Sequence, residues 1–194
     1  MTASTIIGAI IIAMALIVAA IWFLGSRAKK RLATQYPPPG RMVDMGGFQM
    51  HIDCRGDPAA GPAVVMDSGN GEPAMAWASV LPGVAQFARA CAFDRAGLGW
   101  SETSPNPRTL ANYVAEQRTL LARAGIEPPY VLVGHSAGGL YARVYARQYP
   151  DEVAGMVLVD AGHEDLDVRP PESLTKMNKR ALQLMGCAFP IFQM

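Results

Sequence analysis

A serine flanked by glycines stands at residue 136, within the stretch YVLVGHSAGGLYARVY of residues 130–145. The apolar run before it predicts a buried strand, and the residues after it predict a helix. A serine hydroxyl is a weak nucleophile that must be presented to both a base and a substrate. A sharp turn would lift Ser136 to the carboxyl end of a sheet, where Gly134 and Gly138 remove side chains that would collide. The helix directs its first N–H groups at the site, so the amide of Ala137 is expected to help hold an oxyanion.

Acyl transfer by a serine also needs a histidine and an acid that orients it. The chain has three histidines. His135 directly precedes Ser136, and its side chain should diverge from the serine and pack inside the turn. His51 is expected to be a partly exposed strand residue, far from the carboxyl edge of the sheet. His163 follows the apolar strand that ends at Asp160, so these two residues are the candidate base and acid, with shaping of the loop as the alternative.

The segments that must position this serine alternate between strand-like and helix-like patterns from about Gly40 onward. Gly46-Gly47 separates RMVDMG from FQMHIDC and predicts an antiparallel hairpin. Buried strands are predicted in PAVVMDSG, ACAFDR, YVLVGHS and VAGMVLVDA. Helices are predicted in AMAWASVLPGVAQFA, which Pro82-Gly83 must break or kink, in TLANYVAEQRTLLARAG and in AGGLYARVYARQYP. This alternation predicts an α/β fold with a mostly parallel sheet and helices on both faces.

An uncharged apolar run over residues 5–25 precedes this region and is long enough to cross about 30 Å of hydrocarbon as a helix. A cleaved signal peptide fits less well, because no Lys or Arg precedes the run and no Ala-x-Ala site follows it. A buried core helix is the remaining alternative. We therefore expect a transmembrane anchor over residues 1–26 and a basic, proline-rich linker over 27–40. Arg27, Lys29, Lys30 and Arg31 follow the run and favour a cytoplasmic main domain by the positive-inside rule.

Four stretches together resemble the α/β-hydrolase superfamily, in particular bacterial serine hydrolases of the esterase and aminopeptidase type. They are DSGNG at 67–71, FDRAGLGWS at 93–101, VLVGHSAGG at 131–139 and YPDEVAGMVLVDAGHED at 149–165. The resemblance implies that the N–H of Gly69 or Asn70 is the second oxyanion donor. It also implies structural contacts for Asp94 and Arg95, and a pocket lined by Asn70 and Trp100.

The resemblance further implies eight strands, with the catalytic acid after the seventh and the histidine after the eighth. About six strands are predicted here, so we expect a partial core over residues 41–168 and the start of a cap over 169–194. Together with the apolar run, the resemblance implies a membrane-anchored serine hydrolase that is expected to cleave an ester, amide or related acyl bond of a small-molecule substrate. The alternative is a truncated, inactive hydrolase-like domain that lacks the triad histidine and serves in binding or has no role.

The three cysteines, Cys54, Cys91 and Cys187, form no Cys-x-x-Cys pair, so zinc and thioredoxin-like chemistry are not indicated. They can be small buried apolar side chains. The resemblance places Cys54 and Cys91 on neighbouring strands, where a disulfide would require an oxidising, extracytoplasmic compartment. A net charge of +1 does not suggest a nucleic-acid partner. Serine acyl chemistry implies no metal and no organic cofactor.

Overall fold

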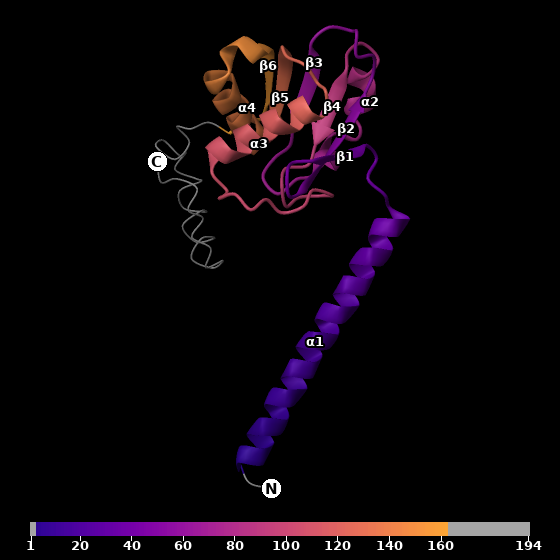
Figure 1. The fold of residues 1–194 in the computed structure, drawn as a ribbon, viewed down its shortest axis with the longest axis vertical. Helices are drawn as coiled ribbons and strands as arrows, with labels where there is room; N and C mark the ends of the chain where they lie inside the picture. Colours follow the sequence, from indigo (N-terminus) through magenta and orange to yellow (C-terminus); the bar gives the residue numbers. More distant parts are fainter. Residues whose placement is uncertain (1–2, 163–194) are drawn as a thin grey trace. The chain divides into compact units, whose positions relative to one another are not determined.

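The structure is a computed structural model that describes residues 3–162. The chain divides into two units, residues 1–39 and residues 40–194 (Figure 1). The expected start of a cap over 169–194, and His163, lie outside the described residues.

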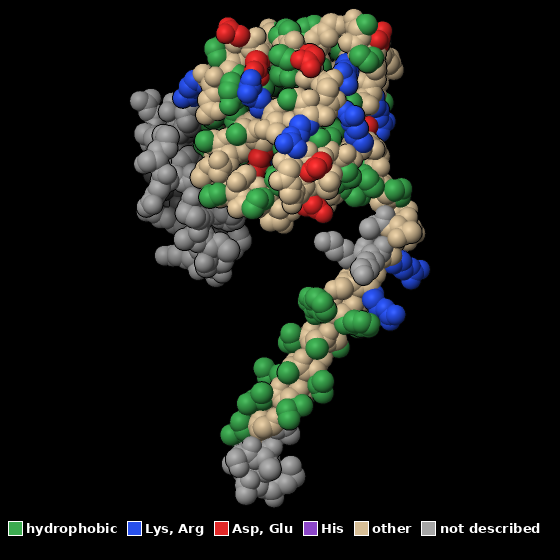
Figure 2. All heavy atoms as spheres, viewed as in Figure 1, with side chains coloured by type: hydrophobic (Ala, Val, Ile, Leu, Met, Phe, Trp, Pro, Cys, Tyr) green, Lys and Arg blue, Asp and Glu red, His purple; other side chains and the backbone are tan. Residues whose placement is uncertain are grey.

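The first unit is helix α1 (Ala3–Gln35), which continues through the basic segment. Its window Ile10–Ala28 is apolar enough to cross a membrane by length and composition, which a signal sequence could also satisfy. None of this window is buried, and Figure 2 shows hydrophobic side chains along the visible face of the helix. Within this unit Leu16 and Ile21 are each 65% exposed.

The second unit is built on a six-stranded sheet with the order β1-β2-β4-β3-β5-β6. Strands β1 and β2 pair antiparallel, as do β2 and β4, whereas β4, β3, β5 and β6 run parallel to one another. The strands are β1 (Arg41–Asp44), β2 (Gln49–Arg55), β3 (Ala63–Asp67), β4 (Ala90–Phe93), β5 (Tyr130–His135) and β6 (Val153–Val159). The predicted fold class, a mostly parallel sheet that begins with an antiparallel hairpin, is confirmed.

The hairpin between β1 and β2 turns at Gly46 and Gly47, whose φ angles are 89° and 122°. An L-residue with a side chain rarely adopts such values, which is why glycine is needed here. The Met45 amide donates to the Phe48 carbonyl oxygen over 2.8 Å and closes the loop.

Helices cover both faces of the sheet, as predicted (Figure 1). They are η1 (Ala74–Trp77), α2 (Leu81–Val84), α3 (Leu110–Arg123), α4 (Ala137–Gln148) and η2 (Pro150–Glu152). Pro82 falls in the first turn of α2, where its missing N–H has no intrahelical partner to lose. The segment that Pro82-Gly83 was predicted to break or kink is two short helices, and the break lies before Pro82 rather than at it.

Alternate residues of the strands point to opposite faces of the sheet and pack into two separate apolar cores. Val65 of β3 belongs to the larger core, together with Leu120 of α3 and Tyr145 of α4. Its neighbour Met66 belongs to the smaller core beneath η1 and α2, together with Trp77. Because both faces of β3 are buried, its residues before Asp67 form a continuous apolar run.

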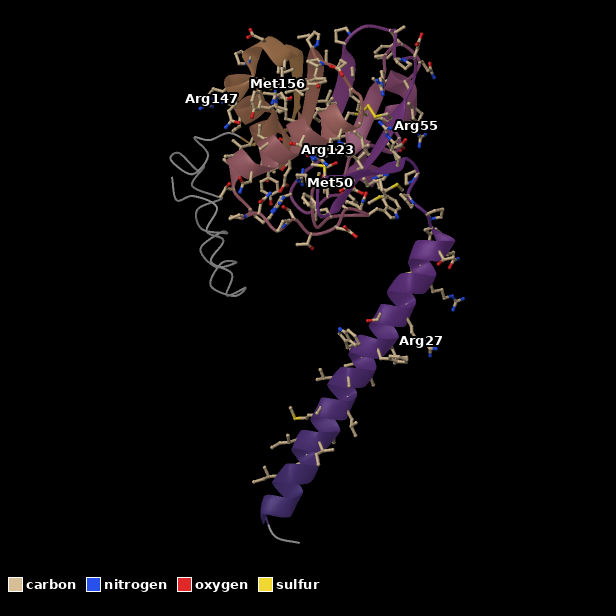
Figure 3. All side chains as sticks on the ribbon, in the orientation of Figure 1. Arg27, Met50, Arg55, Arg123, Arg147 and Met156 are labelled. Carbon is tan, nitrogen blue, oxygen red and sulfur yellow. A yellow bond between two sulfur atoms is a disulfide. The ribbon has the colours of Figure 1, made fainter. Side chains whose placement is uncertain are left out.

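A disulfide joins Cys54 of β2 to Cys91 of β4, and the two residues are direct partners in the strand register. Figure 3 shows the bond near Arg55. Cys91 is fully buried in the larger core, and Cys54 packs against that core. The disulfide alternative of the sequence analysis is thus the arrangement that the structure has for these two residues.

Candidate active site

Ser136 lies between the carboxyl end of β5 and the first turn of α4, as predicted. Its backbone has φ 51° and ψ −118°, in a region that residues with a side chain rarely occupy. Such local strain persists only where the surrounding structure enforces it, and it concentrates at functional sites. The side chain does not cap its own helix, and the residue is half-buried. The Ser136 hydroxyl therefore lies at the carboxyl edge of the sheet and does not cap helix α4.

The glycines around Ser136 are required by close backbone approaches. A Cβ on Gly134 would lie 2.5 Å from the carbonyl carbon of Gly138, and one on Gly138 would lie 2.3 Å from the carbonyl oxygen of Asp67. A Cβ on Gly139 would lie 2.3 Å from the Cβ of Ala161. Gly134 thus lets strand and helix meet, whereas Gly138 lets the helix approach the end of β3.

The turn after β3 is held from the interior of the domain by Arg95. Its guanidinium donates to the carbonyl oxygen of Ser68 over 2.7 Å, to that of Gly69, and to the Asp67 carboxylate. Arg95 is 5% exposed, so these bonds form in a desolvated environment where they are strong. In a planar trans peptide the carbonyl and the following N–H point in opposite directions. With the Gly69 carbonyl directed at Arg95, the Asn70 amide is directed away from it.

Asp67 is the carboxylate partner of Arg95 and is buried with it. Burial raises the pKa of Asp67 to about 6, against the opposing effect of the Arg95 charge. The pair fixes the end of β3 beneath the nucleophile elbow, the sharp turn at Ser136 between β5 and α4. Arg95 therefore makes the structural contacts that the resemblance implied, with Asp67 as its carboxylate partner.

Glu72 belongs to the site although the sequence analysis did not single it out. Its Oε2 accepts the Gly69 amide over 2.8 Å and the Nδ1 of His135 over 3.1 Å. The hydrogen bond from the Gly69 amide is the main reason that the pKa of Glu72 lies below its usual range, and the bond from His135 adds to this effect. The Gly69 amide is thus already occupied. The one local signal was an acidic residue closing a Gly-x-Gly turn, which is weak by itself.

His51 contradicts its predicted environment. The residue is fully buried, and its Nδ1 lies 2.9 Å from the carboxylate of Asp94. It sits opposite the end of β4, because β2 runs antiparallel to that strand, and so lies near the carboxyl edge that we expected it to avoid. The prediction failed because strand alternation alone cannot show which neighbour covers a side chain. Three strand spacings, about 14 Å, still separate β2 from β5.

Asp94 fixes the loop after β4. Besides His51, it accepts the amides of Ala74 over 2.6 Å and Trp100 over 3.0 Å. The Trp100 ring packs against the His51 ring with centroids 5.0 Å apart. Asp94 thus makes the structural contacts that the resemblance implied.

Asp160 follows β6 at the same edge as Ser136, is exposed, and has a φ of 43°. The chain then returns to the elbow, because the Gly162 amide donates to the Ser136 carbonyl oxygen over 2.8 Å. The structure therefore brings Ser136, Ala137, Gly69, Asn70 and Asp160 to one edge of the sheet.

Residues 62–186, which include Ser136 and the four parallel strands, match a known family that is described as the alpha/beta hydrolase fold. The chain belongs to that family. Its Cfl2 neighbour from Burkholderia cenocepacia superposes with a TM-score of 0.66 at 26% identity, over 77% of this chain and 51% of that one.

Two further proteins are similar to this chain. The 2-hydroxy-6-oxo-6-phenylhexa-2,4-dienoate hydrolase of a Rhodococcus strain superposes with a TM-score of 0.59 at 26% identity, over 72% of this chain and 52% of that one. The vacuolar membrane protein YNL115C of Saccharomyces cerevisiae is 30% identical over 61% of this chain and 21% of its own length. The chain spans about half or less of the curated relatives it matches, with 16%, 38% and 51% of three of them covered.

Proposed function

We propose that the protein is a serine hydrolase in which Ser136 attacks the carbonyl carbon of an ester, amide or related acyl bond. The observation that carries this proposal is the strained backbone of Ser136 at the junction of β5 and α4. That conformation costs free energy, about 1–3 kcal/mol for residues of this kind, and is most simply explained by presentation of the hydroxyl.

The proposed oxyanion donors are the backbone amides of Ala137 and Asn70. Ala137 is the first residue of α4, so its amide has no carbonyl acceptor earlier in that helix. The Gly69 amide is bonded to Glu72, which leaves Asn70 as the donor from the turn. Two amides fixed in this way can receive the negative charge that develops on the substrate oxygen without reorganising.

Catalysis would proceed in two steps. A base takes the proton of Ser136 as its oxygen bonds to the carbonyl carbon, and the leaving group departs with that proton to give an acyl-enzyme. Water, activated by the same base, then releases the acid and restores the serine. We propose His163 as this base and Asp160 as its orienting acid, because Gly162, the residue before His163, is bonded to the Ser136 backbone.

A fluorophosphonate probe tests the proposal, because it reacts covalently with an activated serine. The protein in membranes or detergent should be labelled at Ser136, and Ser136→Ala should abolish this. Ser79→Ala, at an exposed serine between η1 and α2, is the matched control and should retain the label. Labelling that survives Ser136→Ala, or never appears, would reject the assignment. Loss of labelling in His163→Ala would support the proposed base.

A second candidate is a hydrolase-like domain that binds ligands without turnover. One observation favours it: the two histidines within residues 3–162, His51 and His135, both pair through Nδ1 with carboxylates of the scaffold. Binding of an acyl compound by a protein that no probe labels would support this candidate.

We propose further that α1 anchors the protein in a membrane and that the second unit lies on the extracytoplasmic side. The apolar span and the vacuolar membrane relative support the anchor. The Cys54–Cys91 disulfide supports the side, since such bonds persist in oxidising compartments. The basic residues after the span favour the opposite side. Protease added to sealed, right-side-out vesicles should digest the second unit, and full protection would show the cytoplasmic arrangement.

A further inference from the structure

One carboxylate joins the turn after β3 to the residue that precedes Ser136. Glu72 Oε2 accepts the Gly69 amide over 2.8 Å and the Nδ1 of His135 over 3.1 Å. The carboxylate therefore bridges two segments that are 63 residues apart in the sequence. Because β5 leads directly from His135 into Ser136, the bridge reaches the elbow itself.

The bridge fits closely around a glycine. A Cβ on Gly69 would lie 2.7 Å from Glu72 Oε2 and 3.2 Å from His135 Nδ1, so a side chain at residue 69 would displace the carboxylate. The Glu72 amide also donates to the Gly69 carbonyl oxygen over 3.1 Å, which closes the turn. Gly71 has a φ of 75°, which suits the tight turn.

The backbone of Gly69 is therefore hydrogen-bonded on two sides. Glu72 holds its N–H on the side of His135, and Arg95 holds its carbonyl oxygen from the interior. The N–H belongs to the Ser68–Gly69 peptide plane and the carbonyl to the Gly69–Asn70 plane. With both planes held, rotation about the backbone of Gly69 is restricted and the direction of the Asn70 amide is set. Removal of the Glu72 carboxylate would free the Gly69 N–H and leave the Asn70 amide held through the Gly69 carbonyl alone.

We propose that Glu72 is a positioning residue that clamps the turn to the elbow and so holds the Asn70 amide where it can receive the oxyanion. The proposal rests on the proposed function, because it assigns the amide a role only in acyl transfer at Ser136. Glu72 acts through Gly69 and His135 and need not contact the substrate.

Because the Glu72–His135 pair is partly exposed, a positioning role for Glu72 and a purely structural role predict different effects of its removal. The side chain of Glu72 is 43% exposed and that of His135 is 35% exposed. Exposed pairs of this kind contribute little to folding. A purely structural bridge would therefore leave little trace when removed, whereas displacement of a catalytic group by about 1 Å can slow a reaction up to about a hundredfold.

The test compares Glu72→Ala with Glu72→Gln in the full-length protein, with the rate of fluorophosphonate labelling at Ser136 as the readout. We expect Glu72→Ala to slow labelling between about tenfold and a hundredfold, with an unchanged melting temperature. Glu72→Gln keeps an oxygen that can accept the Gly69 amide, and should recover most of the rate. Glu127→Gln removes one exposed carboxylate near the opposite end of β5 and should label like the unsubstituted protein.

Hydrogen exchange of the Gly69 amide provides a readout that does not require activity. The amide should exchange slowly in the unsubstituted protein and in Glu72→Gln, and quickly in Glu72→Ala. Fast exchange in the unsubstituted protein would show that the bridge does not form, and would overturn the inference. So would a Glu72→Ala protein that labels at the normal rate or that loses its folded structure.

The two readouts also separate the inference from the function it rests on. A protein whose Gly69 amide is protected by Glu72, but whose Ser136 is never labelled, refutes the hydrolase assignment and the positioning role while it confirms the bridge. A protein that labels at Ser136 equally in all Glu72 variants keeps the assignment and refutes the positioning role alone.

Discussion

Arg95 lies beneath Gly69 and donates to its carbonyl oxygen from within the domain, where the guanidinium is 5% exposed. The bond turns the following amide away from the interior. A single buried cation thereby orients a backbone group at the edge of the sheet. The planar guanidinium of Arg95 donates to the Ser68 and Gly69 carbonyl oxygens through two of its nitrogens at the same time. The single ammonium group of a lysine would do this less well.

Replacement of Arg95 by lysine tests this arrangement. We expect Arg95→Lys to keep the charge opposite Asp67 but to lose the forked contact, so that labelling at Ser136 falls by at least about tenfold. Thermal unfolding measured in parallel would show a modest loss of stability, because a buried hydrogen bond is missing. Unchanged labelling in a folded Arg95→Lys protein would contradict the role of the fork.

Gly138 permits the closest helix–strand approach at the site. A Cβ there would lie 2.3 Å from the Asp67 carbonyl oxygen, and backbone cannot move aside as a flexible side chain could. We expect Gly138→Ala to destabilise the domain by about 1–3 kcal/mol, as overpacked positions do, and to impair labelling. Chemical unfolding would measure the change.

Gly83 is the matched control for this substitution, because nothing lies within 4 Å of the Cβ that an alanine would add there. Gly83→Ala, inside α2, should be neutral or slightly stabilising, since alanine favours helix. Equal destabilisation by the two substitutions would show that the crowding at Gly138 has no special effect.

The fold was largely predictable from the sequence because it depends on local patterns. Strand β3 is buried on both faces and is therefore apolar up to Asp67. The close contacts at Gly134 and Gly138 require glycine at both positions. Ser136 and its elbow were predictable for the same reason. Their catalytic roles remain predictions.

The environment of His51 and the role of Glu72 could not be predicted in this way. His51 is buried because β2 pairs with β4 and thereby meets Asp94, which lies 43 residues away. Glu72 reaches His135 across a longer gap of 63 residues. Neither partner leaves a periodic signal, since such contacts depend on strand order and on the path of loops.

The disulfide between Cys54 and Cys91 closes a loop with a sequence separation of 37. In the chain-entropy account such a cross-link stabilises a domain by about 3–4 kcal/mol. We expect the double variant Cys54→Ser with Cys91→Ser to unfold at a lower urea concentration by a corresponding amount. Reductant should shift the unsubstituted protein in the same direction and leave the double variant unaffected. Free thiols at both positions in unreduced membranes would contradict the bond and the extracytoplasmic proposal together.

Glu152 makes the stability of the domain depend on pH. Its carboxylate accepts from Arg118 over 2.7 Å and from the Tyr145 hydroxyl over 2.6 Å, and the Arg118 bond is the main reason that the pKa of Glu152 lies below its ordinary value of 4.5. A lowered carboxyl pKa stabilises the fold above the ordinary value, and that contribution is lost as the pH falls through the lowered one.

We therefore expect Glu152→Gln to lower the free energy of unfolding by about 1 kcal/mol near neutral pH, since Arg118 is half exposed and solvent screens the pair. The difference from the unsubstituted protein should shrink as the pH falls below 4.5, the ordinary value for Glu152, because protonation makes the native side chain neutral as well. Urea titrations at several pH values between neutral and acid measure this, with Glu127→Gln as the charge-matched control. A difference that stays constant across this range would show that Glu152 stabilises the fold through packing alone.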